Sequence, residues 1–388
     1  MRENTPSHSL NFTPYLTLFL PTMHNLAEVA GLFDMRADFV NGHPYGSGHI
    51  NDTYCAYYDQ AGQRVRYIHQ RLSTEAFKKP IELMENVGRV TEHSLKQLLE
   101  DGNPEARRRT LTCVPSVNGT PHAIDAKGNC WRTYPFIERA RTYDTIESEA
   151  QATEAARAFG EFQKLAATMP GEPLHETIPG FHNTKQRFEH LVTAIEADTE
   201  NRANDVQKEI DWFMARQSEG SKVVDMLEAG EIPLRVTHND TKLNNVMLDD
   251  VTGEGVCVID LDTTMPGSAV YDFGDMVRTA TSPVAEDEVD TSKITMRMHM
   301  FEALVKGYLA SAGSFLTDKE RSLLAFSGKL LTMECGTRFL TDYLKGDVYF
   351  KIHRDGHNLD RTRSQIALAE SIEAQMPEME ALVAKYSK

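Results

Sequence analysis

Long apolar runs are missing from this chain of 388 residues. A membrane-spanning helix needs about 18 or more consecutive apolar residues, and no stretch approaches that length. The apolar residues 16–20 are few, lie between Pro14 and Pro21, and lack the small-residue cleavage site of a secretory leader. We therefore expect no membrane association and a cytoplasmic location, with residues 1–22 forming a flexible extension.

An excess of positive charge is also missing. Lys and Arg total 41 against 57 Asp and Glu, which gives a formal net charge of −16. Proteins that bind nucleic acids contact the phosphates through Lys and Arg, so this balance argues against a nucleic-acid partner. We expect the one short basic run, Arg107 to Arg109, to be a solvated loop.

Cysteine is sparse and shows no pairing pattern. The chain has five cysteines, and none of them forms a CxxC pair. In a chain of this length, scattered cysteines indicate reduced intracellular thiols, not a disulfide framework or a zinc site. No feature of the sequence indicates an obligate protein partner.

Two kinds of hydrophobic pattern divide the chain. The first part predicts helices at residues 25–33 and 81–99 and strands at 39–44, 50–58, 65–71, 110–117 and 130–137. The second part contains one strand-rich stretch at 234–262 and predicts helices at 147–168, 185–196, 204–230, 293–312, 318–343 and 363–388. We predict an α+β protein with a smaller sheet-containing lobe at 23–136 and a larger, mainly helical lobe at 137–388.

The strongest motif is HNDTKLNN at residues 238–245, which has the form HxDxxxxN. This is the catalytic-loop spacing of protein kinases and their relatives. Asp240 is then the candidate catalytic residue, which orients the attacking hydroxyl, and Asn245 is a candidate Mg²⁺ ligand with a neutral oxygen. The apolar residues 256–259 lead into Asp260, which takes the position of a second Mg²⁺ ligand.

Three residues in or near this motif have other candidate roles. Asp262 either contacts a second Mg²⁺ or hydrogen-bonds the backbone, and we favour the backbone. Lys242 is either a phosphate contact or a solvent-exposed lysine. His238 is expected to order the loop through hydrogen bonds, because the motif spacing gives the catalytic position to Asp240.

Phosphate contacts are expected in the first lobe. Gly46 and Gly48 flank a turn whose backbone N–H groups can cover a nucleotide. A kinase usually presents a lysine from the strand that follows at residues 65–71, but this chain has none there. Gln70 or Arg71 takes that place, and because neighbouring residues face opposite sides of a strand, only one of them points into the cleft. Glu82 or Glu85 is the candidate ion-pair partner on the following helix.

The segment after Asp260 bears on the size of the acceptor. Protein kinases carry a long activation segment there, whereas this chain reaches YDFGD at 271–275 within a short interval and then becomes helical. The interval leaves little room for a peptide platform, so we expect a small acceptor. Charged and aromatic side chains suited to a sugar ring follow at Arg338, Asp342, Tyr343 and Tyr349, although an ordinary charged helix face explains them equally well.

These motifs resemble those of the aminoglycoside phosphotransferase and choline kinase superfamily, and within it the N-acetylhexosamine 1-kinases. The resemblance covers most of the chain from about Met23 and rests on HNDTKLNN and on YIHQRL (67–72), LMEN (83–86), YPFI (134–137), VIDLDTTMPG (258–267), YDFGD (271–275) and RFLTDYL (338–344). It implies a two-lobed kinase fold, dependence on ATP and Mg²⁺, and phosphorylation of the C1 hydroxyl of GlcNAc or GalNAc.

The same resemblance implies roles for individual residues. Asp240 corresponds to the catalytic Asp, and Asn245 and Asp260 correspond to the Mg²⁺ ligands. Arg338 and Tyr349, with His49, correspond to sugar contacts. Two alternatives remain open at this point. One is another small-molecule kinase of the same fold, acting on an aminoglycoside, choline, homoserine or methylthioribose. The other is an inactive pseudokinase that serves as a binding module.

Overall fold

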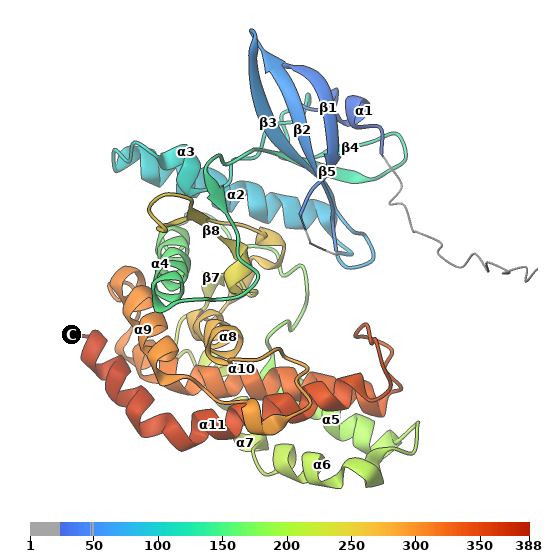
Figure 1. The fold of residues 1–388 in the computed structure, drawn as a ribbon, viewed down its shortest axis with the longest axis vertical. Helices are drawn as coiled ribbons and strands as arrows, with labels where there is room; N and C mark the ends of the chain where they lie inside the picture. Colours follow the sequence, from blue (N-terminus) through green and yellow to red (C-terminus); the bar gives the residue numbers. More distant parts are fainter. Residues whose placement is uncertain (1–23, 47, 49) are drawn as a thin grey trace, which may run out of the picture.

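The computed structural model describes residues 24–46, 48 and 50–388. It confirms the expected two-lobed α+β fold, in which a small lobe built on an antiparallel sheet lies against a larger lobe made mainly of helices (Figure 1). The predicted extension at residues 1–22 lies outside the described residues. No helix within the described residues is both long and apolar enough to cross a membrane.

The small lobe contains a five-stranded sheet in the order β1-β2-β3-β5-β4. Its elements are α1 (Leu26–Ala30), β1 (Asp38–Pro44), β2 (Asp52–Gln60), β3 (Gln63–Arg71), α2 (Pro80–Glu100), α3 (Ala106–Arg109), β4 (Ala123–Ile124) and β5 (Cys130–Pro135). Ala61 and Gly62 join β2 to β3, and both have positive φ (54° and 84°). A two-residue loop of this kind matches the twist of the strands it connects, so it fixes the register of the hairpin.

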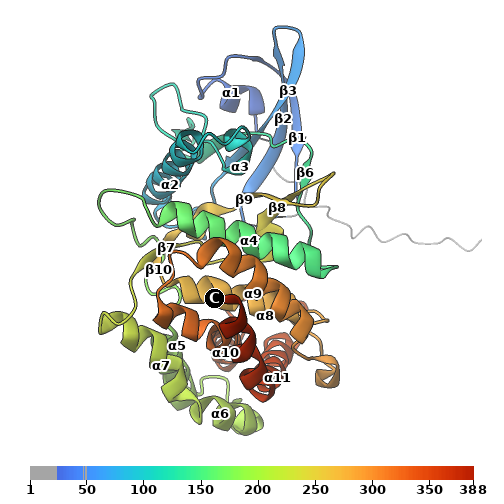
Figure 2. The same cartoon turned by 90° about the vertical axis from the view of Figure 1, so that its left-hand side faces the viewer.

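The large lobe contains the remaining elements, which include two small sheets, β10-β7 and β6-β8-β9. They are β6 (Ala140–Arg141), α4 (Glu149–Ala166), α5 (Thr184–Ala197), η1 (Ala203–Val206), α6 (Gln207–Met214), α7 (Gln217–Glu228), β7 (Arg235–Thr237), η2 (Leu243–Asn245), β8 (Val246–Asp249), β9 (Gly255–Val258), η3 (Leu261–Thr263), β10 (Met265–Gly267), α8 (Ala269–Thr281), η4 (Thr291–Lys293), α9 (Met298–Ala312), α10 (Asp318–Leu344) and α11 (His357–Tyr386). Long helices α10 and α11 pack side by side, as Figures 1 and 2 both show.

One continuous hydrophobic core connects the two lobes. Pro80 begins α2, where its missing N–H costs no hydrogen bond, and Leu83, Val87 and Val90 form the buried stripe of that helix. These residues belong to the same core cluster as Phe159 on α4. Helix α4 lies between α2 and α9 (Figure 2), so the small lobe rests on the large one through apolar contacts.

Two predicted elements differ from the structure. Residues 110–117 form no regular strand. They contain only a single bridge between Phe33 and Ser116, and Val114 donates to the Thr133 carbonyl at 2.8 Å. The predicted helix at 204–230 is broken into η1, α6 and α7. The second break lies at Arg216, whose guanidinium stacks on Trp212 and pairs with Glu373, so contacts with α11 override the helical pattern.

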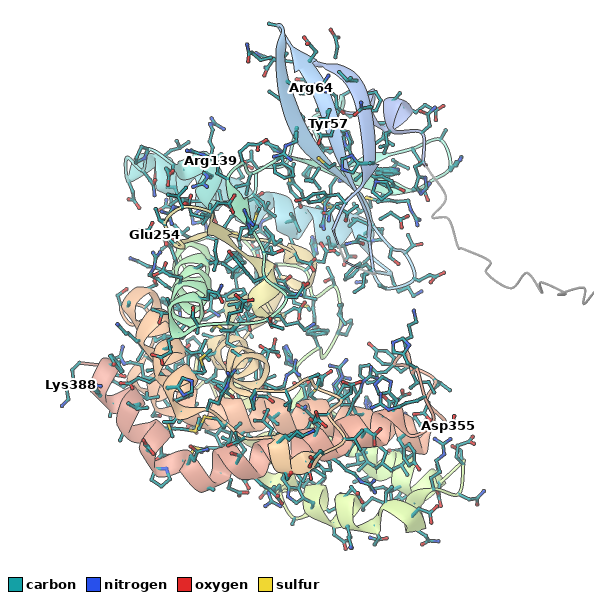
Figure 3. All side chains as sticks on the ribbon, in the orientation of Figure 1. Tyr57, Arg64, Arg139, Glu254, Asp355 and Lys388 are labelled. Atoms are coloured by element: carbon teal, nitrogen blue, oxygen red, sulfur yellow. The ribbon has the colours of Figure 1, made fainter. Side chains whose placement is uncertain are left out.

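The basic run is also not the solvated loop that we expected. Arg108 donates to the carbonyl of Arg139 at 2.8 Å and pairs with Asp249 at 2.7 Å. Arg109 donates to the Gly255 carbonyl at 2.6 Å. Residues Arg139 and Glu254, labelled in Figure 3, mark this contact region. The run lies in α3, and these contacts join the small lobe to β8 and β9 of the large lobe.

Candidate active site

A buried carboxylate holds the backbone of the HxDxxxxN loop. Asp272 on α8 accepts hydrogen bonds from the N–H groups of His238 (2.9 Å) and Asn239 (2.7 Å). Gln163 donates to the same carboxylate at 2.5 Å. Burial raises the pKa of Asp272, and the hydrogen bonds from these N–H groups act in the opposite direction. The loop that follows β7 is thus anchored to the core one residue before Asp240.

His238 orders this loop, as the sequence predicted. Its Nδ1 accepts from the Asp240 N–H at 3.2 Å, and its Nε2 donates to the Ile259 carbonyl at 2.9 Å. Its ring packs against Phe159 and Phe162, with centroids 5.3 and 5.8 Å away. Because Nδ1 accepts and Nε2 donates, the ring carries a single proton on Nε2. It links the start of the loop to the strand that delivers Asp260.

Three of the predicted site residues meet at the end of the loop. The side-chain amide nitrogen of Asn245 donates to the Asp240 carbonyl at 2.9 Å and to its carboxylate at 3.1 Å. Lys242 pairs with the other carboxylate oxygen of Asp240 at 2.9 Å. The Asp240 side chain is 28% exposed, so an acceptor hydroxyl can reach it. The amide nitrogen of Asn245 binds Asp240, so its amide oxygen is the atom available to a metal.

Asp260 lies next to this cluster. The N–H of Ile259 donates to the Asn245 carbonyl at 2.8 Å, and Asp260 follows with a left-handed backbone (φ 58°). Burial raises the pKa of its carboxyl to about 6, Asp262 adds to the rise, and Arg132 opposes it. One carboxylate and one amide oxygen fit Mg²⁺ when phosphates and water complete the shell. In the described part of the chain, no three His, Cys, Asp or Glu side chains converge on a metal site, so a protein-only metal cage is not formed there.

Asp262 makes side-chain contacts in place of the expected backbone contact. It forms a buried ion pair with Arg132 on β5, and Asn51 donates to its second oxygen at 2.6 Å. The two charged side chains are only 3% and 1% exposed. Asn51 lies three residues after Gly48 and belongs to the small lobe. Asp262 therefore connects the metal-binding region to the small lobe.

The sheet register explains how Arg132 reaches this position. Thr53, Gln70 and Arg132 are neighbours across β2, β3 and β5. Gln70 donates to Thr53 at 3.0 Å and accepts from Arg132 at 2.9 Å. Gln70 therefore faces Asp262, whereas Arg71 faces the other way and pairs with Asp52 at 2.6 Å. Of the two residues that replace the usual lysine, only Gln70 points toward the catalytic lobe.

The proposed helix partners of that position are used elsewhere. Glu82 pairs with Lys79 at 2.9 Å, and Glu85 contacts His175 at 2.6 Å. Gly46 has a φ of +83°, a backbone conformation that glycine adopts without strain. At Gly46 and Gly48 an added Cβ would meet no atom within 4 Å, so both positions border open space. His49, a predicted sugar contact, lies outside the described residues.

Arg338 and Tyr349, the two described residues predicted as sugar contacts, lie near each other. The Arg338 guanidinium lies 6.0 Å from the centroid of the Tyr349 ring, and Tyr349 is 73% exposed. Asp342 serves a different purpose from the one considered above. Its carboxylate accepts from the N–H groups of Tyr349 (2.8 Å) and Phe350 (2.9 Å). It therefore fixes the turn that presents Tyr349. Tyr343 stacks on Arg202 at 4.6 Å and is not part of this pair.

A buried pair that the sequence did not reveal, Glu334 and His182, contacts the catalytic loop. Glu334 lies one helical turn before Arg338 on α10 and is 2% exposed. His182 binds Glu334 through Nδ1 at 2.8 Å and the Asn239 carbonyl through Nε2 at 3.2 Å. The four-residue spacing of Glu334 and Arg338 is the only sequence signal, since His182 lies in a distant loop before α5.

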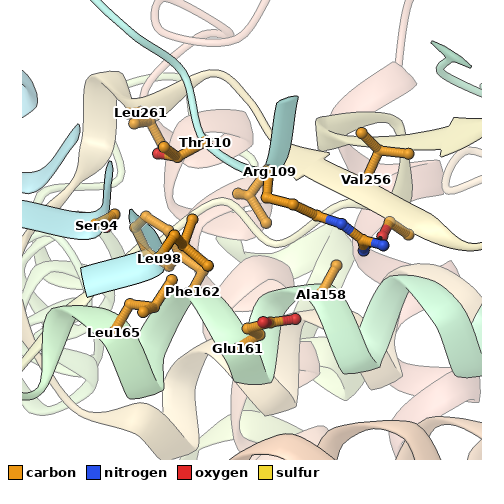
Figure 4. Close-up of a pocket in the computed structure, with 12 residues that line it drawn as sticks. Ser94, Leu98, Arg109, Thr110, Ala158, Glu161, Phe162, Leu165, Val256 and Leu261 are labelled. Carbon is orange, nitrogen blue, oxygen red and sulfur yellow. Dashed lines mark hydrogen bonds between the residues drawn. The ribbon is translucent and has the colours of Figure 1, made fainter. Parts of the chain in front are cut away.

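A separate pocket lies between α2, α4 and β9 (Figure 4). Its wall is mostly apolar and includes Leu98, Phe162 and Val256. Arg109 also lines it, and its guanidinium is bound to the Gly255 carbonyl. None of the predicted site residues lines this pocket, so it is distinct from the cluster around Asp240.

Comparisons with known proteins identify the family and the fold. The family described as "Phosphotransferase enzyme family" matches residues 42–313, well over half of the chain. The structure is similar to that of an aminoglycoside phosphotransferase from Alicyclobacillus acidocaldarius, with a TM-score of 0.60, 12% identity, and coverage of 94% of this chain and 97% of that chain. It is also similar to a microcompartment-associated aminopropanol kinase, with a TM-score of 0.52, 14% identity, and coverage of 92% and 98%. At these identities the two solved structures support the fold alone.

Proposed function

The chain belongs to the phosphotransferase enzyme family, and from this premise we propose that it transfers the γ-phosphate of ATP to the C1 hydroxyl of an N-acetylhexosamine. The product would be the sugar 1-phosphate. The observation that carries the choice of acceptor is the proximity of the Arg338 guanidinium to the exposed ring of Tyr349.

The residues around Asp240 have separate roles in this proposal. Asp240 orients the acceptor hydroxyl and accepts its proton as the phosphate transfers. Asn245 and Asp260 would hold Mg²⁺, which neutralises phosphate charge when it is bound. Lys242 pairs with Asp240 and would act as a point charge for the transferring phosphate. Gly46 and Gly48 allow the backbone of the small lobe to approach the nucleotide, and Gln70 faces the same side.

The charges near the acceptor position favour a neutral sugar over an amine. Arg187 and Arg338 both lie near Glu334, and His182 binds it, so this carboxylate already has cationic neighbours. An aminoglycoside or choline brings further positive charge, which these cations would repel. A sugar with an acetamido group offers hydroxyls and a carbonyl, which the guanidinium of Arg338 and the ring of Tyr349 can recognise.

An ATP-consumption screen tests this function. The panel contains GlcNAc, GalNAc, glucose, choline, homoserine and an aminoglycoside, each with and without Mg²⁺. We expect turnover of the two N-acetylhexosamines and substantially lower kcat/KM for glucose, because a site built to hydrogen-bond a group rejects analogues that lack it. Turnover of choline or an aminoglycoside in preference to both N-acetylhexosamines would overturn the choice of acceptor.

A second measurement separates an active enzyme from a pseudokinase. We expect ATP to raise the melting temperature in the presence of Mg²⁺ and much less in its absence, because Asn245 and Asp260 bind the nucleotide through the metal. A shift that is independent of Mg²⁺, together with no turnover of any acceptor, would favour the binding module.

A further inference from the structure

His182 has a hydrogen bond acceptor on each ring nitrogen. The carboxylate of Glu334 lies 2.8 Å from Nδ1, and the main-chain carbonyl of Asn239 lies 3.2 Å from Nε2. A carbonyl oxygen only accepts, and an ionised carboxylate only accepts. Both nitrogens of His182 must therefore carry protons for both bonds to form, and a ring with two protons is a cation.

We propose that His182 is a positioning residue, held as a doubly protonated cation, that fixes Asp240 for phosphoryl transfer by binding the carbonyl of the residue before it. This inference rests on the proposed phosphotransferase function. Asn239 has a left-handed backbone (φ 66°), and its N–H is bound to Asp272. The peptide unit that leads into Asp240 is held at its carbonyl by His182 and at its N–H by His238, so it has one orientation.

The surroundings of His182 favour the charged ring. Glu334 faces it from α10 and Asp275 from α8, while the cations near Glu334 are Arg187 from α5 and Arg338 from α10. The rings of Phe181 and Tyr271 pack against it at 4.7 and 5.4 Å. Burial alone would lower the pKa of His182, but Glu334 and Asp275 outweigh burial and raise it. Burial acts to raise the pKa of Glu334, and His182 with the two arginines holds it below its usual range.

The pH dependence follows from this arrangement. The raised pKa means that His182 is protonated below that pKa and loses one proton as the pH rises through it. Loss of the proton removes one of the two hydrogen bonds and leaves a buried Glu334 beside a neutral ring. We therefore expect kcat to fall on the alkaline side with the titration of His182.

Two variants and one control test the inference in the full-length enzyme. His182→Phe keeps a flat ring and removes both donors, and His182→Gln keeps one donor. We expect kcat to fall by about 10²-fold in His182→Phe and less in His182→Gln, with the KM for ATP nearly unchanged, because misplacement of a reacting group by about 1 Å has effects of that size. His190→Gln, an exposed histidine on α5, is the matched control and should keep wild-type kinetics.

Nitrogen NMR of His182 in the intact wild-type protein gives a readout that depends on neither acceptor nor variant. We expect both ring nitrogens to show the shifts of a protonated imidazolium at pH 7. A neutral His182 at pH 7 would overturn the inference, as would a folded His182→Phe enzyme that keeps wild-type kcat or keeps the alkaline fall unchanged. Absence of kinase activity toward every acceptor would count against the proposed function and leave the NMR result to decide this point.

Discussion

His182 and His238 bind the two polar atoms of one peptide unit, the unit that joins Asn239 to Asp240. His182 donates to its carbonyl oxygen at 3.2 Å, and His238 accepts from its N–H at 3.2 Å. The two rings therefore need different protonation states, with two protons on His182 and one on His238. The backbone of Asp240 is held from both sides before any substrate binds.

The first prediction concerns Asp240. Asp240→Asn should lower kcat by about 10²–10⁴-fold, because the amide cannot accept the proton of the acceptor hydroxyl. The melting temperature and the affinity for Mg²⁺-ATP should change little, since the side chain is partly exposed and the loop is anchored by Asp272. Steady-state kinetics and nucleotide titration measure these quantities. A variant that keeps more than about a tenth of wild-type kcat would show that Asp240 is not the catalytic residue.

The buried ion pair of Arg132 and Asp262 predicts a loss of stability. Asp262→Ala leaves the Arg132 charge buried without its partner, so we expect the free energy of unfolding to fall by about 3–5 kcal/mol. The double variant Arg132→Met with Asp262→Ala removes both charges and should recover most of that loss. Urea denaturation measures all three proteins. The exposed pair of Arg141 and Asp250 is the control, and Asp250→Ala should cost less than about 1 kcal/mol. Equal losses of unfolding free energy in Asp262→Ala and Asp250→Ala would show that burial of the ion pair does not determine its effect.

The raised pKa of Asp260 predicts that this residue lowers the stability of the metal-free protein while it serves metal binding. Its folded pKa, about 6, lies above the usual value for an aspartate, so ionisation between about pH 4 and 6 destabilises the metal-free protein. Asp260→Asn removes that ionisation. We expect the variant to be more stable than the wild type by about 1–3 kcal/mol at pH 8 and by less at pH 5, and to lose Mg²⁺-dependent ATP binding. Unfolding curves at both pH values without metal provide the measurement. A gain that grows toward low pH would have the wrong sign.

Arg338 should affect the acceptor more than the nucleotide. Arg338→Ala removes the cation beside the Tyr349 ring and one of the charges near Glu334. We expect kcat/KM for GlcNAc and GalNAc to fall by roughly 10- to 100-fold, corresponding to one lost charged hydrogen bond, with the dissociation constant of ATP unchanged. Lys319→Ala, in an exposed ion pair on the same helix, is the control. A larger change in the dissociation constant of ATP than in kcat/KM for the sugar would assign Arg338 to the nucleotide site and contradict this prediction.

Much of the fold and of the catalytic loop could be predicted from sequence because the signals are local. HxDxxxxN depends on spacing within one loop, and Asn245 reaches Asp240 over five residues. The β2–β3 hairpin follows from the Gly62 turn, and α2 follows from Pro80 and a regular apolar stripe. Such patterns depend on interactions between residues close in sequence, so they can be recognised without knowledge of the tertiary structure.

The contacts that the sequence did not reveal connect distant segments. Arg132 meets Asp262 because β5 pairs with β3, and that register is set by the whole sheet. His182 meets Asn239 because α5 packs on α10 next to the catalytic loop. The prediction that Asp262 binds the backbone missed Arg132, which lies 130 residues away in the sequence. In each case the partner is more than 50 residues away.

Phosphorus NMR of the product formed from GlcNAc, ATP and Mg²⁺ tests the central claim most directly. The proposed reaction predicts a sugar phosphate whose phosphorus signal is split by coupling to the anomeric proton, and this signal should be missing with Asp240→Asn. A product phosphorylated at C6, whose phosphorus couples to the two C6 protons, would contradict the proposal. So would the absence of any product from GlcNAc and GalNAc when the same enzyme phosphorylates choline or an aminoglycoside.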